Sequence, residues 1–83
     1  MKKVEIYTTQ TCPYCVRAKD LLRRKKIPFV EIDVSDDEVQ RQRMEKLSGR
    51  RTAPQIVING EAIGGCDDLY ALEAAGKLDV MVH

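Results

Sequence analysis

The sequence predicts an α/β domain in which four strands form one mixed sheet and three helices pack against it, in the order β-α-β-α-β-β-α. Three observations support this fold class. At 83 residues the chain is too short for two domains, so we treat residues 1–83 as a single domain. Segments with the apolar spacing of strands alternate with segments that have helical spacing. An Asn-Gly pair separates the last two strand-like segments, which indicates an antiparallel hairpin.

The first strand and the first helix follow directly from this spacing. Val4 and Ile6 alternate with charged residues, which indicates a short strand, and the polar residues 8–11 indicate a loop. Pro13 suits the first position of a helix because it has no N–H group to lose there. The apolar stripe of this helix consists of Cys15, Ala18, Leu21 and Leu22. Four cations at positions 23–26 close the helix, where its dipole favours positive charge.

A second strand and a second helix are predicted next. Pro28 opens a strand in which apolar and acidic residues alternate from position 30 to position 34. Ser35 and Glu38 have the spacing of a capping box, so we expect Ser35 to be the N-cap of a helix that runs to about Leu47. Gly49 ends that helix. Its apolar stripe is thin and consists of Val39, Met44 and Leu47.

The last three elements are a hairpin and a helix. The β-branched run 56–58, the Asn59-Gly60 turn and residues 61–64 form an antiparallel pair. Asp67 and Asp68 begin a third helix, and Gly76 is its C′ residue. A helix between the first two strands makes those strands parallel, with a right-handed crossover, so the sheet is mixed. This is the thioredoxin-like arrangement in its smallest form.

Composition and charge exclude several classes of function. With 43% hydrophobic residues, 33% charged residues and a net charge of +1, the chain has the composition of an ordinary soluble domain. No segment approaches the ~20 apolar residues of a membrane span, and no signal peptide follows Met1. The cations at 23–26 lack interleaved aromatic residues, so we interpret them as a solvated helix end. We therefore expect a cytoplasmic monomer with neither membrane nor nucleic-acid partners.

The motif that carries chemistry is Cys12-Pro13-Tyr14-Cys15, at the junction of the first strand and the first helix. Cys12 occupies the predicted N-cap, where free N–H groups and the helix dipole stabilise an anion. A thiolate is the attacking form of cysteine. Cys15 lies one turn later on the same face and is less exposed, so it can reach the Cys12 sulfur but is poorly placed to attack first. The spacing therefore predicts an attacking and a resolving thiol.

A zinc site is the alternative for this pair, and it needs two further ligands. Cys66 offers one, but the only histidine is His83 at the C-terminus, so we expect no metal site. Three cysteines without an export signal also favour reactive thiols over a framework of structural disulfides.

Two further segments are candidates for the walls of a site. Thr52-Ala53-Pro54 either starts a strand at an ordinary proline or, with a cis Ala53-Pro54 bond, turns the Ala53 backbone toward the thiols to pair with an extended peptide. Gly64 and Gly65 permit a close approach of two backbones, and the helix start after them offers N–H groups to a carboxylate. We interpret Cys66 as a small apolar residue packed near the sheet, with a redox role as the alternative. Arg50 and Arg51 adjoin Thr52 and are candidates to meet an anionic substrate.

The three motifs together resemble the small dithiol glutaredoxins in order and spacing, from Val4 to about Leu78. The resemblance implies a cis-proline at Pro54 and a groove for glutathione, which is a cosubstrate and not a bound cofactor. In that groove the tripeptide would pair with the backbone at Ala53, and its γ-glutamyl end would meet Cys66 and Asp67. The other residues that the resemblance assigns to the groove are Tyr14, Arg51 and Thr52.

Two departures from the family pattern concern this groove. Thr9 stands three residues before the first cysteine, where family members often have a lysine. Ala53 replaces the commoner valine, which makes the groove wall shallower. Neither departure changes the cysteines.

The resemblance implies a glutathione-dependent thiol-disulfide oxidoreductase. Its expected partners are glutathione and disulfide-bonded or glutathionylated proteins, with ribonucleotide reductase as one family-level candidate. One alternative is an electron donor reduced by thioredoxin reductase, but that group usually has a tryptophan near the third helix, and this chain has none. The other alternative is a module that binds an iron-sulfur cluster, and Pro13 argues against it because family members that do so generally lack this proline.

Overall fold

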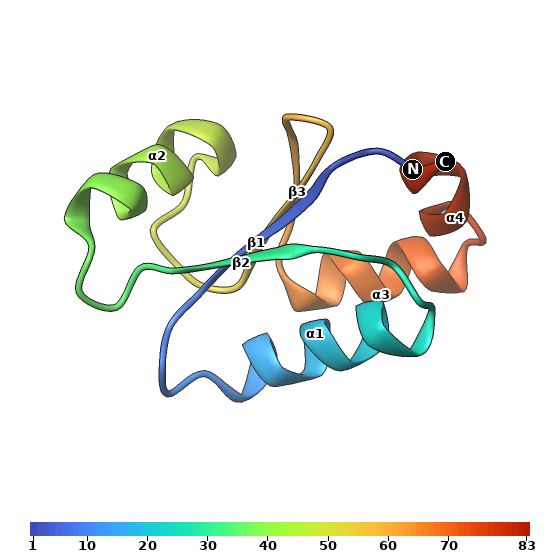
Figure 1. The fold of residues 1–83 in the computed structure, drawn as a ribbon, viewed down its shortest axis with the longest axis horizontal. Coiled ribbons are helices and arrows are strands. Elements are labelled where there is room, and N and C mark those ends of the chain that lie inside the picture. Colours follow the sequence, from blue (N-terminus) through green and yellow to red (C-terminus); the bar gives the residue numbers. More distant parts are fainter.

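The fold is a four-stranded mixed sheet covered by helices, in a computed structural model that describes residues 1–83 (Figure 1). The strands have the order β2-β1-β3-β4, with β1 and β2 parallel and the other two pairs antiparallel. The predicted fold class is confirmed. The bounds of the elements are β1 Val4–Thr8, α1 Pro13–Arg24, β2 Val30–Asp33, α2 Glu38–Ser48, β3 Gln55–Ile58, β4 Glu61–Gly64, α3 Cys66–Ala74 and α4 Leu78–Val82.

Helices cover both faces of the sheet, so the strands β1 and β3 contribute to two cores. On one face, α1 and α3 lie side by side (Figure 1). Ile6, Ile56 and Leu69 belong to the larger core cluster on that face. On the other face, α2 contributes Met44 to a smaller cluster with Tyr7 and Val57. Because successive residues of a strand point to opposite faces, one short strand supplies both cores.

The start of α2 differs from the prediction. Its N-cap is Asp37, whose carboxylate accepts a hydrogen bond from the Gln40 N–H at 3.1 Å. The Ser35 hydroxyl instead accepts from the Gln10 N–H at 2.8 Å and so holds the loop that precedes Cys12. The expected capping box was wrong because Asp36 and Asp37 lie between Ser35 and Glu38, and Asp37 takes the cap. This cap satisfies a donor at the helix start just as a serine would.

The apolar stripe of α2 buries fewer residues than predicted. Met44 is its only buried residue, whereas Val39 and Leu47 are exposed. The helix therefore depends on more than apolar packing to hold its place against the sheet.

A fourth helix, α4, was not predicted. It is only five residues long, and its Leu78 and Val82 are fully buried in the larger core. The Lys2 N–H donates to the Val82 carbonyl at 2.7 Å, which ties the two chain ends together. α3 also begins one residue before the predicted start, at Cys66, with Gly65 as its N-cap. None of the helices has the length and apolar character that crossing a membrane requires.

Candidate active site

Cys12 is the N-cap of α1, as predicted. Its backbone is extended (φ −131°, ψ 99°), and its Sγ accepts a hydrogen bond from the Cys15 N–H at 3.1 Å. Pro13 follows as the first helical residue, where it sacrifices no hydrogen bond. The sulfur thus faces the amino end of the helix, an arrangement that stabilises negative charge on it.

Cys15 has the opposite surroundings. Its side chain is 1% exposed and belongs to the buried face of α1. Burial, together with the hydrogen bond between the two thiols, raises the pKa of Cys15 to about 12, against a smaller lowering by the Thr9 backbone. At neutral pH this thiol is protonated. Cys12, which is only half-buried, is the thiol of the pair that an incoming substrate can reach.

The loop before β3 brings a backbone carbonyl to the reactive sulfur. The Ala53-Pro54 bond is cis, and the Cys12 thiol donates to the Ala53 carbonyl with a separation of 3.6 Å. Gln55 supports this loop from below, since its Nε2 donates to the Thr52 carbonyl at 3.0 Å and lies 3.3 Å from the Thr52 hydroxyl. The stretch Thr52-Ala53-Pro54 is therefore a defined wall beside the thiols.

An open groove of about 180 Å³ begins at this wall. Its sides come from the start of α1, the loop before β3 and the start of α3. The lining residues are Tyr14, Arg50, Thr52, Ala53, Pro54, Gln55, Gly65, Cys66, Asp67 and Asp68. Cys12 does not line the groove, but its thiol donates to the carbonyl of Ala53, which does.

The glycine pair makes the close approach that its sequence permits. A Cβ atom on Gly65 would lie 3.2 Å from the Pro54 carbonyl oxygen, so this backbone comes up against the cis-proline loop. At Gly64, where φ is +117°, a Cβ atom would collide with the Asp68 carboxylate. The same carboxylate accepts from the Gly65 N–H at 3.0 Å and fixes the turn into α3. The third wall of the groove is therefore rigid.

Cys66 is the first residue of α3 and lies 4% exposed at the edge of the larger core. Burial raises the pKa of its thiol, with Asp67 and Cys12 adding to the rise and Arg17 opposing it. The structure agrees with the interpretation of Cys66 as a packed residue, and it also places this residue in the groove lining.

Tyr14 is 55% exposed on the side of the groove formed by α1. The Arg17 guanidinium stacks near its ring, 5.8 Å from the centroid, and lies 5.6 Å from the centroid of Tyr70. Contacts of this kind between a cation and aromatic faces tie α1 to α3 and orient the Tyr14 ring.

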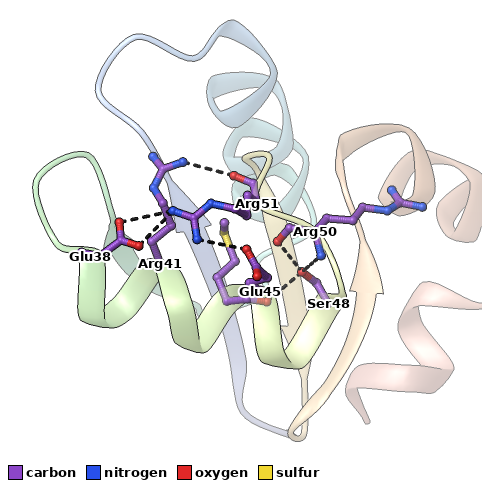
Figure 2. A network of polar contacts seen from close by, with 7 residues as sticks. Glu38, Arg41, Glu45, Ser48, Arg50 and Arg51 are labelled. Atoms are coloured by element: carbon purple, nitrogen blue, oxygen red, sulfur yellow. Dashed lines mark hydrogen bonds and ion pairs between the residues drawn. The ribbon is translucent and has the colours of Figure 1, made fainter.

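The two arginines before Thr52 have different environments. Arg51 does not line the groove, because its guanidinium pairs with Glu38 and Glu45 of α2, each at 3.0 Å. Arg50 lines it, with its guanidinium 3.9 Å from the Asp68 carboxylate. Figure 2 shows the side chains of Arg50 and Arg51 extending in opposite directions from the loop. Their adjacency in sequence gave no means of deciding which one faces the groove.

Two other lining residues were not singled out from the sequence as parts of the site: Gln55 and Asp68. A signal existed for Gln55, since an amide at the head of a fully buried β-branched strand needs polar partners. Asp68 had been interpreted only as part of a helix start.

Comparisons with known proteins agree with this geometry. The glutaredoxin family model matches residues 4–63. The chain is 54% identical over 82 residues to glutaredoxin 3 of Escherichia coli K12, covering 99% of each chain. It is similar to the solution structure of a glutaredoxin from Brucella melitensis, with 55% identity, a TM-score of 0.87 and coverage of 99% of this chain and 89% of the other.

A second solved structure was determined with a ligand. It is the buckwheat glutaredoxin-glutathione complex, with 26% identity, a TM-score of 0.88 and coverage of 98% of this chain and 76% of the other. The family match, the near full-length identity and the two cysteines at the start of α1 together lead to one conclusion. This chain belongs to the glutaredoxin family, the glutathione-dependent thiol-disulfide oxidoreductases.

Proposed function

We propose that Cys12 is the attacking thiol and Cys15 the resolving thiol of this oxidoreductase. The observation that carries the assignment is the contrast between the two sulfurs. Cys12 Sγ is accessible and accepts an N–H group at the amino end of α1, whereas Cys15 is buried with a pKa raised to about 12. A nucleophile needs access to its substrate and surroundings that favour negative charge on sulfur, and the cap position of Cys12 offers both.

With a glutathionylated protein, the Cys12 thiolate attacks the glutathione sulfur of the mixed disulfide. The S–S bond to the protein breaks, the protein leaves as a thiolate, and glutathione is held on Cys12. A second glutathione thiolate then attacks this new disulfide, which releases oxidised glutathione and restores Cys12. Overall, one glutathione thiol is oxidised and one protein thiol is recovered, because the glutathione sulfur of the mixed disulfide is already oxidised.

With a protein disulfide, Cys12 forms a mixed disulfide with one protein sulfur and frees the other. Cys15 then loses its proton and attacks Cys12, which releases the second protein thiol and leaves a Cys12-Cys15 disulfide. Two glutathione molecules reduce that bond. The raised pKa of Cys15 suits this order of events, because a buried, protonated thiol does not compete with Cys12 for the first attack.

We propose that the groove beside Cys12 binds glutathione through Tyr14, Thr52, Ala53, Pro54, Cys66 and Asp67, all of which line it. An extended tripeptide would pair with the Ala53 backbone. Its γ-glutamyl carboxylate would meet the N–H groups at the start of α3, where a helix terminus favours an anion. The glutathione complex of the buckwheat relative supports this use of the groove. We assign no direct contact to Arg51, whose guanidinium is already engaged.

Two substitutions test the assignment of roles. Cys12→Ser should abolish reduction of both substrate types. Cys15→Ser should retain reduction of a glutathione mixed disulfide and lose reduction of protein disulfides that need an internal resolving thiol. Turnover of each variant with a glutathionylated peptide and with a disulfide-bonded protein gives the answer. Appreciable deglutathionylation by Cys12→Ser would show that the attacking role is misassigned.

The protein substrates are a separate part of the proposal. Disulfide-forming and glutathionylated proteins are the chemical class, and ribonucleotide reductase is one candidate within it. Because Cys15→Ser cannot resolve the mixed disulfide, it should retain such a substrate covalently on Cys12. We further propose that the protein is cytoplasmic, because reduced glutathione must be abundant for either route to run toward reduction. We also propose that it acts as a monomer.

A further inference from the structure

The loop between α2 and the cis-proline is fastened to α2 by polar contacts (Figure 2). None of these contacts uses the thiols or the side chain of Arg50, the one residue among them that lines the groove. The Arg51 guanidinium bridges two carboxylates on the same side of α2, those of Glu38 and Glu45, each at 3.0 Å. Its backbone carbonyl accepts from the Arg41 guanidinium at 3.1 Å. Both ends of Arg51, the side chain and the main chain, are therefore held by the same helix.

Ser48 holds the backbone of Arg50, the residue before Arg51. Its hydroxyl accepts from the Arg50 N–H at 3.1 Å and lies 3.0 Å from the Arg50 carbonyl and 2.7 Å from the Met44 carbonyl. Gly49, with φ of +75°, makes the turn that ends α2 between these contacts. The main chain thus leaves α2 in one defined direction.

These contacts end one residue before the groove wall. Thr52 follows Arg51 directly, and its carbonyl and hydroxyl receive the Gln55 amide from the sheet side. Ala53 then presents its carbonyl to Cys12. The wall is therefore held at one end by the sheet, through Gln55, and at the other end by α2, through Arg51.

Apolar packing alone gives α2 a weak hold, because Met44 is its only buried residue. Exposed ion pairs contribute little to global stability. Their effect here is local, since hydrogen bonds between Arg51 and three residues of α2 restrict a loop that has no secondary structure of its own.

We propose that Arg51 is a positioning residue for glutathione, acting through Glu38, Glu45 and Arg41 to hold the Thr52–Pro54 wall at the distance from Cys12 that the tripeptide requires. The inference deepens the proposed use of the groove and rests on it. It makes α2, which contributes no residue to the groove lining, a determinant of affinity.

The experiment compares the two sides of the interaction between Arg51 and the carboxylates of Glu38 and Glu45, which we call the clamp. The variants are Arg51→Gln, the paired Glu38→Gln/Glu45→Gln variant and the combination of all three. Lys46→Gln is the matched control, because it removes a cation from α2 that makes no ion pair. The kinetic measurement is kcat and KM for a glutathionylated peptide, with the glutathione concentration saturating.

A positioning role predicts the same result from either side of the clamp. Arg51→Gln and the paired carboxylate variant should each raise KM about three- to tenfold with kcat little changed, as expected when binding rather than chemistry is affected. The KM of the triple variant should be no higher than that of Arg51→Gln, because both variants lose the same interaction. Lys46→Gln should stay within about twofold of the parent. If only Arg51→Gln raises KM and the carboxylate variant matches the parent, Arg51 contacts the substrate directly and the proposal is wrong.

A second measurement separates this proposal from the use of the groove itself. Backbone ¹⁵N order parameters of Thr52 and Ala53, in protein without glutathione, should fall from a rigid value of about 0.85 in the Arg51 and carboxylate variants and stay unchanged in Lys46→Gln. A parent protein that does not process glutathione mixed disulfides would overturn the groove assignment while leaving this loop result intact. Normal turnover with unchanged order parameters in every variant would overturn the clamp alone.

Discussion

Cys12 and Cys15 lie three residues apart on one helix, yet their surroundings give them opposite properties. The cap position leaves Cys12 accessible and directs the Cys15 N–H group at its sulfur. The helical stripe carries Cys15 into the core, where burial favours the neutral thiol. The asymmetry follows from the single fact that α1 begins between the two residues.

Alkylation should display this asymmetry across all three thiols. In reduced protein at pH 7, a brief treatment with limited iodoacetamide should modify Cys12 and leave Cys15 and Cys66 unmodified, because both of those are buried with raised pKa values. Peptide mass spectrometry gives the labelled fraction at each site. Labelling of Cys66 should increase only as the pH rises above the ordinary range of a cysteine, near 8.5.

The Cys12→Ser variant is the control for that experiment, and it should remain largely unlabelled under the same conditions. Equal labelling rates at Cys66 and Cys12 in the parent protein would contradict the packed assignment of Cys66. Such a result would make Cys66 a third thiol available to exchange.

At the scale of elements, the sequence predicted what local chemistry determines. The cap at Cys12, the Asn59-Gly60 hairpin and the buried stripe of α1 each depend on a few neighbouring residues, and all are present. The remaining ambiguities were choices between similar neighbours. Ser35 and Asp37 are both good caps, and Arg50 and Arg51 are both candidate anion contacts. Tertiary contacts decide the cap, because the Ser35 hydroxyl accepts from the Gln10 N–H and leaves Asp37 to cap α2. They also distinguish the two arginines, since Arg51 pairs with α2 and Arg50 approaches Asp68.

The cap of α2 can be tested by replacing Asp37. Asp37→Ala should lower the free energy of unfolding by about 1 kcal/mol, because the Gln40 N–H loses its acceptor at the helix start. Asp37→Asn retains a capping oxygen and should lose much less. Urea denaturation of the parent and the two variants measures the difference.

The comparison between alanine and asparagine separates capping from other effects of the carboxylate. Should the two variants unfold at the same urea concentration, Asp37 does not cap α2 through its side-chain oxygen. The loss of charge near the helix dipole would then account for any effect.

At the scale of the whole molecule, the sheet separates two unequal cores, and the site lies where three loops meet at one edge. The residues of the groove come from the start of α1, the loop before β3 and the start of α3, which are distant in sequence. A chain of this length buries only roughly 60% of its unfolded surface. The candidate substrate site is therefore an open groove beside Cys12 instead of an enclosed cavity.

The larger core depends on α4, which no local signal predicted. A five-residue helix has too few positions to show periodicity, and its placement is determined by the space that Leu78 and Val82 fill between the sheet and the preceding helix. Lys25, the C-cap residue of α1, adds a polar link, since its ammonium contacts Glu73 at 2.9 Å and Asp79 at 3.1 Å. The C-terminal segment is thus part of the fold and not an appendage.

Leu78→Ala should therefore destabilise the whole protein. Truncating a fully buried leucine costs roughly 2–5 kcal/mol, through lost apolar burial and the cavity that remains. A domain of this size has a total stability of roughly 4–12 kcal/mol, so the variant should unfold at a much lower urea concentration.

Val80→Ala is the matched control, because Val80 is 74% exposed on the same helix and its loss should change stability by no more than about 0.5 kcal/mol. If the two variants have the same urea midpoint, α4 frays in solution and the core closes without it. Leu78 belongs to the core and does not line the groove. The Leu78→Ala protein should therefore show parent-like turnover at temperatures where it remains folded.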